Sequence, residues 1–310
     1  MGIGYLAVLI NSTIRSTTPV LLAALGSAIC SQAGVFNIAL EGQMLIASFT
    51  AIAVNYLTGS LLLSVVAGVL SGALVGTIVA ILQVKYNAAD MVIGTSINLL
   101  VGGLTSILLF LILGVKGGFN DPTLISLKKI SLPFIRDIPF IGRVFDNLTI
   151  IDYLAYVIAI IIFIYLYKTV SGFRVISIGV NKEAAESLGI KAIRTRMMMV
   201  ILSGALCGLG GTVLSIGQVT LFTENMTSGR GFIAMAAASM GMNHPLYIII
   251  SSLFFGFAQA FGASMQNTIP SQLTMAIPYI ATIIALAIFS NKTKKNKLLN
   301  NISKKEKAKR

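Results

Sequence analysis

The sequence predicts an all-α fold: a polytopic transmembrane helical bundle of about eight to ten membrane segments, some of them short or broken. Of its 310 residues, 56% are hydrophobic and 11% are charged, whereas soluble domains average roughly 45–50% and ~25%. The mean hydropathy is +0.89. Because a spanning helix needs about 20 apolar residues, the chain has room for many spans, which excludes a protein with a single membrane anchor.

Apolar stretches recur along almost the whole chain. In order they are 19–30, 38–57, 61–82, 91–115, 150–167, 197–216, 231–242, 246–265 and 273–290. Stretches 19–30 and 231–242 have only about half the length that a span needs, and such backbone is expected where protein or a cavity surrounds it. Glycines at four-residue spacing, Gly68, Gly72 and Gly76 and also Gly204 and Gly208, predict helix faces that approach each other closely.

The distribution of Lys and Arg predicts the topology. We expect one transmembrane domain over 1–290 and a basic, disordered tail over 291–310, with the C-terminus cytoplasmic. The loop at about 168–196 is also basic and is placed inside. Since an even number of crossings must separate these two segments, 231–242 has to supply one of them, and the loop at about 116–149 is then extracytoplasmic. The side of the N-terminus stays open.

Several chemistries lack the residues they need. The formal charge of +13 lies largely in the tail, which favours an anionic lipid surface over nucleic acid. Cys30 and Cys207 lie in apolar context and are expected in the core. His244 has no companions at metal-ligand spacing, so no metal is expected and a membrane enzyme ranks last. No GxxxxGK[ST] loop occurs, so any ATP energy must come from a partner protein.

Polar residues inside the apolar stretches are candidates for a solute pathway. Glu41 faces either a cavity or, equally in keeping with its position, a helix end with which its carboxylate pairs. The uncharged Asn98, Gln218 and Gln259 suit an uncharged, hydrogen-bonding solute, although each of these side chains alone also suits a contact between helices.

A short cytoplasmic helix is predicted between Asn181 and Gly189. Asn181 is a good N-cap, Glu183 lies near the positive helix start, and Gly189 can end the helix in a left-handed conformation. So short a helix needs packing to be stable. Ala184 and Ala185 keep it thin. With Leu188 and Ile190 as apolar contacts it could enter a groove of another subunit; the alternative is an ordinary surface loop.

This segment resembles a known coupling motif. Glu183, Ala184, Ala185 and then Gly189 resemble the EAA-x-x-x-G motif of ABC-importer permeases, and the variant with Asn181 and Ile190 resembles the branch that imports simple sugars and nucleosides, which is related to ribose and branched-chain amino acid permeases. Residues 34–44 (GVFNIALEGQM) and 229–237 (GRGFIAMAA) are similar most of all to nucleoside permeases. The proline that often follows the coupling motif is absent after Ile201 and Leu202, as is common in the sugar branch.

The resemblance implies a non-catalytic permease subunit in the bacterial plasma membrane. Its expected partners are two ABC ATPase subunits, a second permease chain and an extracytoplasmic substrate-binding lipoprotein. The second permease chain is either another copy of this chain or, as the resemblance favours, a related but non-identical one. ATP and Mg would be bound by the ATPases, so no cofactor is expected in this chain. ATPase coupling would fall to 181–190, and the solute path to the broken segments near Asn37 and Gly231, with Glu41, Asn98, Gln218 and Gln259.

The sequence leaves open which class of solute the protein transports. The resemblance favours nucleosides over a ribose-like sugar. A self-sufficient ion-coupled transporter that uses Glu41 is the alternative from a different class.

Overall fold

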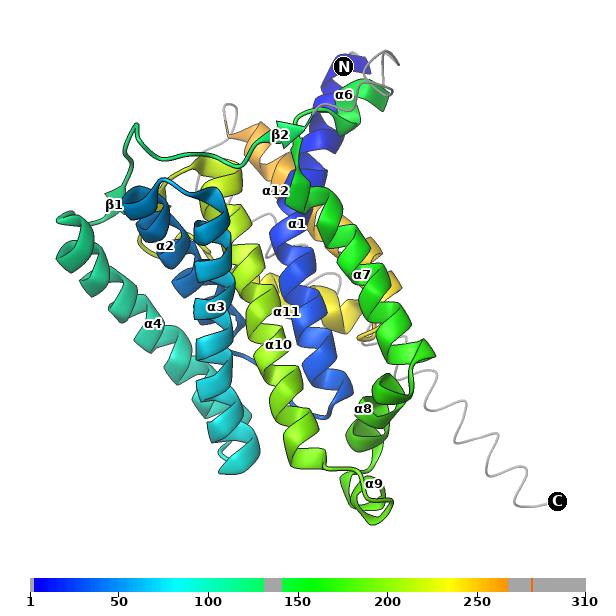
Figure 1. Cartoon of the computed structure of the whole chain (residues 1–310). Helices are drawn as coiled ribbons and strands as arrows, with labels where there is room; N and C mark the ends of the chain where they lie inside the picture. Colours follow the sequence, from blue (N-terminus) through cyan, green and yellow to red (C-terminus); the bar gives the residue numbers. More distant parts are fainter. Residues whose placement is uncertain (1–2, 131–140, 267–279, 281–310) are drawn as a thin grey trace.

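The computed structural model describes residues 3–130, 141–266 and 280, and these form a helical bundle (Figure 1). The helices and strands, in order, are α1 (Ile3–Gln32), α2 (Leu40–Thr58), α3 (Leu61–Ala80), η1 (Ile81–Lys85), α4 (Asp90–Leu113), β1 (Gly118–Phe119), β2 (Lys129–Ile130), α6 (Ile141–Phe145), β3 (Leu148–Thr149), α7 (Ile150–Lys168), α8 (Val170–Val180), α9 (Lys182–Ser187), α10 (Ala192–Thr212), η2 (Val213–Val219), β4 (Phe222–Thr223), α11 (Arg230–Met240) and α12 (Pro245–Met265). The π-helical turns η1 and η2 continue α3 and α10.

The residues at the helix ends explain where several helices start and stop. The Thr149 side chain caps α7 by accepting from the Asp152 N–H, and the Asp152 carboxylate in turn accepts from the Thr149 N–H at 2.7 Å. α2 and α4 end at Gly59 and Gly114, whose φ angles of 60° and 72° are left-handed. Pro245 occupies the first turn of α12, where its missing N–H costs nothing.

The bundle has two distinct ends. Two short antiparallel strand pairs, β1 with β4 and β2 with β3, lie at one end, which we call the strand end, and α8 and α9 lie at the other, the α9 end (Figure 1). α1 begins at the strand end, because the Asn11 amide donates to the carbonyls of Val144 and Asp146, both at 2.8 Å. The start of α1, whose side the charge pattern left open, is therefore opposite α9.

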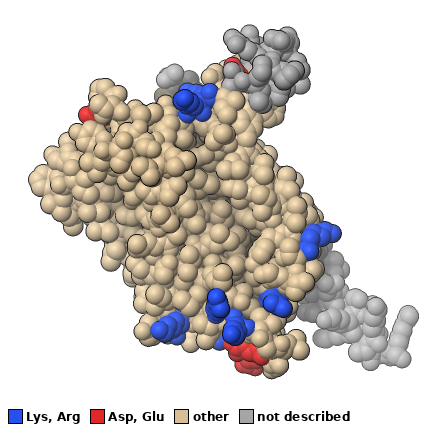
Figure 2. All heavy atoms as spheres, viewed as in Figure 1, with Lys and Arg blue, Asp and Glu red and all other residues tan. Residues whose placement is uncertain are grey.

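Five of the long spans expected from the sequence are present among the described residues, whereas α2, which covers the expected span 38–57, is not among the helices that are apolar enough. Among the described residues, six helices are long and apolar enough to cross a membrane: Gly4–Gln32, Leu61–Lys85, Asp90–Leu113, Ile150–Lys168, Ala192–Val219 and Pro245–Met265. Figure 2 shows Lys and Arg side chains gathered at the α9 end, with fewer at the strand end and a broad uncharged belt between them on the face in view. The all-α polytopic fold is confirmed. The stretch 273–290 and the tail 291–310 lie outside the described residues, apart from position 280.

The prediction of a half-length first segment is wrong. α1 is a continuous helix of 30 residues that includes Pro19. Polar residues interrupt its hydropathy without interrupting the helix, since the hydroxyls of Thr13, Thr17 and Thr18 donate to carbonyls four residues earlier in the same helix. Pro19 has no N–H for the carbonyl of Arg15, and the Gln218 amide donates to that oxygen instead, at 2.6 Å.

The other short segment is confirmed. α11 has 11 residues. Together with the irregular chain before it, α11 connects the strand end of the bundle to the α9 end. β4, at the strand end, precedes it, and the turn that follows it reaches the α9 end, where the Gln32 amide donates to the Asn243 carbonyl at 3.1 Å. This crossing is the one that the charge pattern requires.

The core depends on close helix contacts. A Cβ on Gly72 of α3 would collide with the backbone of Gly204 and lie 2.7 Å from the Cα of Gly208, both on α10. The four-residue glycine spacing therefore does mark a close approach of helices. Cys30 and Cys207 are both fully buried free thiols in the main hydrophobic cluster, which confirms their packing role.

The α3–α10 contact predicts that Gly72→Val is destabilising while Gly103→Val is not. The added side chain at Gly72 meets backbone that cannot rotate away, whereas a Cβ on Gly103 meets nothing within 4 Å. Overpacking of this kind costs about 1–3 kcal/mol. The check is the temperature at which the purified protein loses its monodisperse peak in size-exclusion chromatography. Equal temperatures for both variants would contradict this packing.

Candidate functional site

A break in the helices separates α1 from α2 and carries several of the expected path residues. Residues 33–39, which we call the break, contain Gly34 at a φ of 75°. Asn37 lies in the break and is 1% exposed. Its amide nitrogen donates to Gln43 Oε1 at 3.2 Å and to Ser203 Oγ at 3.1 Å, and its oxygen accepts from the Ala39 N–H at 3.0 Å. Asn37 thus connects the break to both α2 and α10.

Glu41 joins the starts of two helices. It lies in the first turn of α2, is 8% exposed, and accepts from the backbone N–H groups of Gly229 at 2.7 Å and Gly231 at 2.6 Å. Those two groups form the N-terminus of α11. One carboxylate therefore lies at the positive ends of α2 and α11 and satisfies two N–H groups of α11 that have no partner inside the helix. Of the two alternatives for Glu41, this contact is the helix-end pairing.

The close approach at Glu41 requires glycine. A Cβ on Gly231 would lie 2.5 Å from the backbone nitrogen of Glu41 and 2.8 Å from its Oε2. Gly229, the N-cap of α11, has a left-handed φ of 75°. These two positions explain why the segment 229–237 begins with Gly-Arg-Gly.

Asn98 of α4 holds the same helix start from the opposite side. Its oxygen accepts from the Gly42 N–H at 2.8 Å, and its nitrogen donates to the Ile38 carbonyl at 3.0 Å. The N-cap residue Ala39 has no side chain to do this. We call the set of Asn37, Glu41 and Asn98 the polar junction.

Two buried polar groups next to the polar junction have no partner among the described residues. They are the amide nitrogen of Gln43 and the hydroxyl of Thr227. The polar junction uses most of its hydrogen-bonding atoms to hold helices together, whereas these two groups of Gln43 and Thr227 have no such use in the described structure. Direct contact of Asn37, Glu41 or Asn98 with a solute stays a prediction.

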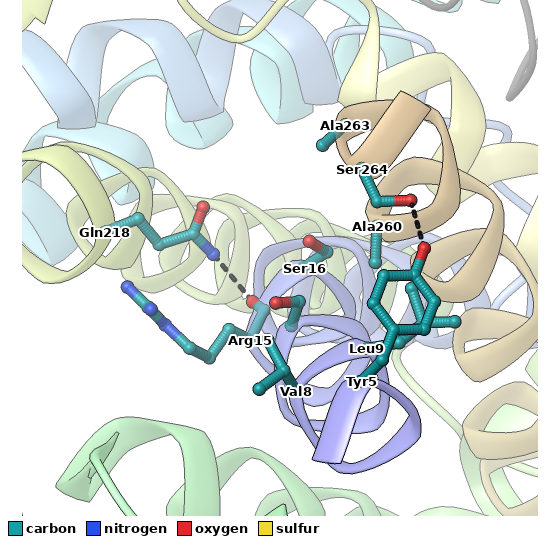
Figure 3. Close-up of a pocket in the computed structure, with 10 residues that line it drawn as sticks. Tyr5, Val8, Leu9, Arg15, Ser16, Gln218, Ala260, Ala263 and Ser264 are labelled. Carbon is teal, nitrogen blue, oxygen red and sulfur yellow. Dashed lines mark hydrogen bonds between the residues drawn. The ribbon is translucent and has the colours of Figure 1, made fainter. Parts of the chain in front are cut away.

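Gln218 and Gln259 lie apart from the polar junction. Gln218, in η2, borders a cavity of about 420 Å³ between α1, η2 and α12 (Figure 3). Its lining residues are Tyr5, Val8, Leu9, Ser12, Arg15, Ser16, Gln218, Ala260, Ala263 and Ser264. Gln259 of α12 precedes a lining residue in the chain but is not itself part of the lining, and its amide nitrogen is buried without a partner in the described structure.

Sequence reasoning missed the polar side of α1 in this cavity. Ser12, Arg15 and Ser16 are spaced at i, i+3 and i+4, which places them on one helix face. The sequence did contain a signal for this site: an arginine inside an apolar helix, with two serines spaced so that they share its face.

The short helix predicted between Asn181 and Gly189 is present as α9. The Asn181 side chain accepts from the Ala184 N–H at 3.0 Å, and Gly189 has a φ of 80°, as expected for an N-cap and a left-handed helix end. Ala185 is buried against Ile178, Ile190 and Ala192. In contrast, Leu188 is 82% exposed, and Glu183 and Ala184 are exposed as well. α9 therefore rests on its neighbours through Ala185 and presents its other residues outward.

The α9 end is joined to the break. Arg196, in the second turn of α10, donates from Nε to the Ala33 carbonyl at 2.9 Å. Gly179 of α8 packs so closely on the backbone of Gln32 and Gly34 that a Cβ would collide there. The helices before and after α9, α8 and α10, thus both contact the first residues of the break.

His244 lies in the turn before α12, as expected, and packs among aromatic rings. Its ring centroid is 4.6 Å from Tyr247, 4.9 Å from Tyr167 and 5.4 Å from Phe163. In the part of the chain that the structure describes, no three His, Cys, Asp or Glu side chains are grouped in a way that could hold a metal ion.

Comparison with known proteins identifies the family. Residues 9–286 match the family described as the branched-chain amino acid transport system permease component. The chain belongs to this permease family. It is 34% identical to the guanosine ABC transporter permease protein NupQ of Bacillus subtilis over 92% of both chains, and 32% identical to the nucleoside ABC transporter permease protein NupC of Lactococcus lactis over 93% of both.

A relative with a sugar in its name is more distant. The putative glucose ABC transporter permease protein TsgC13 of Haloferax volcanii is 27% identical over 85% of this chain and 79% of its own. No solved structure matches the chain. The chain is therefore a multi-pass permease subunit of an ABC importer, as the coupling motif suggested.

The contacts of Glu41 predict that Glu41→Gln loosens α11. An amide keeps one acceptor oxygen but turns an NH₂ group toward an N–H donor, so one of the two hydrogen bonds is lost. A buried hydrogen bond to a charged group contributes about 1.5 kcal/mol or more, so amide hydrogen exchange over 229–240 should accelerate at least about tenfold. Glu224→Gln is the control, because that exposed carboxylate accepts only from Gly117 at the surface. Unchanged exchange in Glu41→Gln would show that Glu41 does not hold α11.

Proposed function

We propose that this permease subunit takes up nucleosides. The observation that carries the proposal is the similarity to two permeases whose names specify guanosine and nucleosides, at 34% and 32% identity along more than nine tenths of the chain. The weaker identity of 27% to a putative glucose permease supports the sugar alternative less well. The uncharged amides near the bundle interior suit a neutral solute rich in hydrogen-bonding groups, which a nucleoside is.

The proposed orientation places the α9 end in the cytoplasm and the strand end outside. The concentration of Lys and Arg at the α9 end supports this, since basic residues favour the cytoplasmic side (Figure 2). An extracytoplasmic binding lipoprotein then docks at the strand end, and ABC ATPase subunits, which hold the ATP and Mg, receive 181–190. A second, related permease chain completes the pathway in the plasma membrane.

The proposed coupling route runs from α9 to α11. A displacement of α9 moves α8 and α10, which touch the break through Gly179 and Arg196. The break continues through Asn37 into α2, and Glu41 ties the start of α2 to the start of α11. Movement at the cytoplasmic surface is thereby transmitted to a half-length helix inside the bundle, a form of helix that lines substrate sites in other transporters.

The solute path is proposed to pass the polar junction, Gln218 and Gln259. Their contacts with solute are brief, because a pathway that binds tightly does not release. The donors without partners, such as the amide nitrogens of Gln43 and Gln259, are available for these contacts.

The exposure pattern of α9 predicts that Glu183→Lys and Leu188→Asp each reduce ATP-dependent uptake to less than about a tenth while the protein remains in the membrane. Both side chains point outward, so the variants change the surface offered to an ATPase and leave the Ala185 contact intact. Ser177→Ala on α8, outside 181–190, removes an exposed hydroxyl that bonds only to its own helix and should retain uptake. Normal uptake in both test variants would refute coupling through α9.

The nucleoside proposal predicts that uptake of labelled guanosine or uridine requires both this chain and ATP and is unaffected by excess ribose. The measurement compares cells with and without the chain, with a parallel sample depleted of ATP. If deletion leaves uptake unchanged, or ribose competes fully, the nucleoside assignment is wrong and the permease assignment remains.

A further inference from the structure

One face of α1 forms a polar wall of the 420 Å³ cavity. Tyr5, Ser12, Arg15 and Ser16 line it from α1, and Gln218 faces them from η2 (Figure 3). The Tyr5 hydroxyl donates to Ser264 Oγ at 3.2 Å and so connects α1 to α12 along the cavity. Because α1 begins at the strand end, the cavity, which Tyr5 lines, extends toward that end of the bundle, which the proposed orientation places outside.

Except for the Tyr5 hydroxyl, the polar side chains that α1 contributes to this wall are not used by the fold. On an adjacent face of α1, the buried hydroxyls of Thr13 and Thr17 donate to their own helix. Among the described residues, neither the hydroxyls of Ser12 and Ser16 nor the guanidinium of Arg15 makes a hydrogen bond or ion pair. A guanidinium without a partner is costly in an apolar helix and indicates a functional site. The wall therefore offers a planar set of N–H donors flanked by two hydroxyls.

The opposite wall offers a hydrogen-bond acceptor. The Gln218 nitrogen donates to the Arg15 carbonyl, the oxygen that Pro19 leaves without its usual partner. This bond fixes the orientation of the amide, and Figure 3 shows the Gln218 oxygen directed away from that bond. The two walls together present donors from Arg15, an acceptor from Gln218, and hydroxyls that serve as either.

A 6-oxopurine nucleoside matches these groups. The O6 and N7 atoms of such a base are adjacent acceptors that a guanidinium binds through two N–H groups, whereas adenine places an amino donor at position 6. The base N1–H is a donor for an amide oxygen, and ribose hydroxyls pair with serine hydroxyls. The volume lies within the roughly 300–1,000 Å³ typical of small-molecule sites.

We propose that the Arg15 cavity is an outer recognition site in which Arg15 selects nucleosides with a 6-oxopurine base, such as guanosine and inosine, over adenosine. This inference rests on the proposed nucleoside transport and adds a specificity residue to it. The site is separate from the polar junction, whose side chains hold helices together.

The test measures maximal uptake of guanosine and of adenosine by the complete transporter carrying Arg15→Gln, Arg15→Lys or Lys128→Gln. Each rate is divided by the wild-type rate for the same nucleoside, so any selectivity of a binding protein cancels. Membrane levels and co-purification of the ATPase subunits show that each variant assembles. Lys128→Gln removes one exposed positive charge from the strand end outside the cavity and is the matched control.

Arg15→Gln is expected to lower the guanosine-to-adenosine ratio about tenfold, because glutamine pairs with the N6 and N7 atoms of adenine and cannot bind O6 and N7 as arginine does. Arg15→Lys should also lower the ratio, since an ammonium lacks the planar fork. Lys128→Gln should leave it unchanged.

Two results would overturn the inference while nucleoside transport stands. Equal losses for both nucleosides in Arg15→Gln would assign Arg15 a structural role, and a wild-type ratio in Arg15→Lys would assign it a charge role, such as contact with lipid phosphate. If the wild-type transporter carries neither nucleoside, the proposed function fails and this inference fails with it.

Discussion

The arrangement of the interior depends on one carboxylate between two helix starts. Helix N-termini present N–H groups that have no partner in their own helix, and such groups are expensive away from water. Glu41 satisfies two of them at α11 while lying in the first turn of α2. This bridge helps a half-length helix to begin inside the bundle. Gly231 follows from the same constraint, because a side chain there would displace the backbone of Glu41.

A similar constraint explains α1. A proline in a membrane helix frees a carbonyl that must find a donor from the surrounding protein. Gln218 supplies that donor from η2, nearly two hundred residues later in the chain, at 2.6 Å. The same bond borders the Arg15 cavity and orients the amide that faces it. The hydrogen bond from Gln218 to the Arg15 carbonyl thus has two effects. It satisfies the carbonyl that Pro19 leaves free, and it fixes a polar side chain in the wall of the cavity.

The connections of α9 give the structure a direct link between its surface and its interior. Close packing of Gly179 and the hydrogen bond from Arg196 fix the break to α8 and α10, and close packing of this kind transmits displacement because it has little room to deform. The break leads in turn to Asn37 and Glu41. Leu188 is exposed on α9 and forms part of the surface proposed for the ATPase contact.

The sequence by itself determined the membrane class, the placement of most helices, the caps of α9 and the family. These depend on local hydropathy, on short-range capping and on a contiguous motif, all of which can be read along the chain. It also located the short segment that became α11. It misplaced the first segment, because hydropathy counts hydroxyls and an arginine as interruptions, whereas the helix tolerates them once their groups are bonded or face a cavity.

Only the tertiary structure decided what the polar residues touch. Asn37, Asn98 and Glu41 were all candidates for a solute path, yet their hydrogen bonds hold the fold. Asn98 and Glu41 bond to helix starts that are distant in sequence, and Asn37 bonds to Ser203 within α10. Arg15 carried little weight in the sequence, and its importance appears only when η2 and α12 enclose it. The physical reason is that burial and pairing of a polar group depend on neighbours brought together by the fold, which no local pattern specifies.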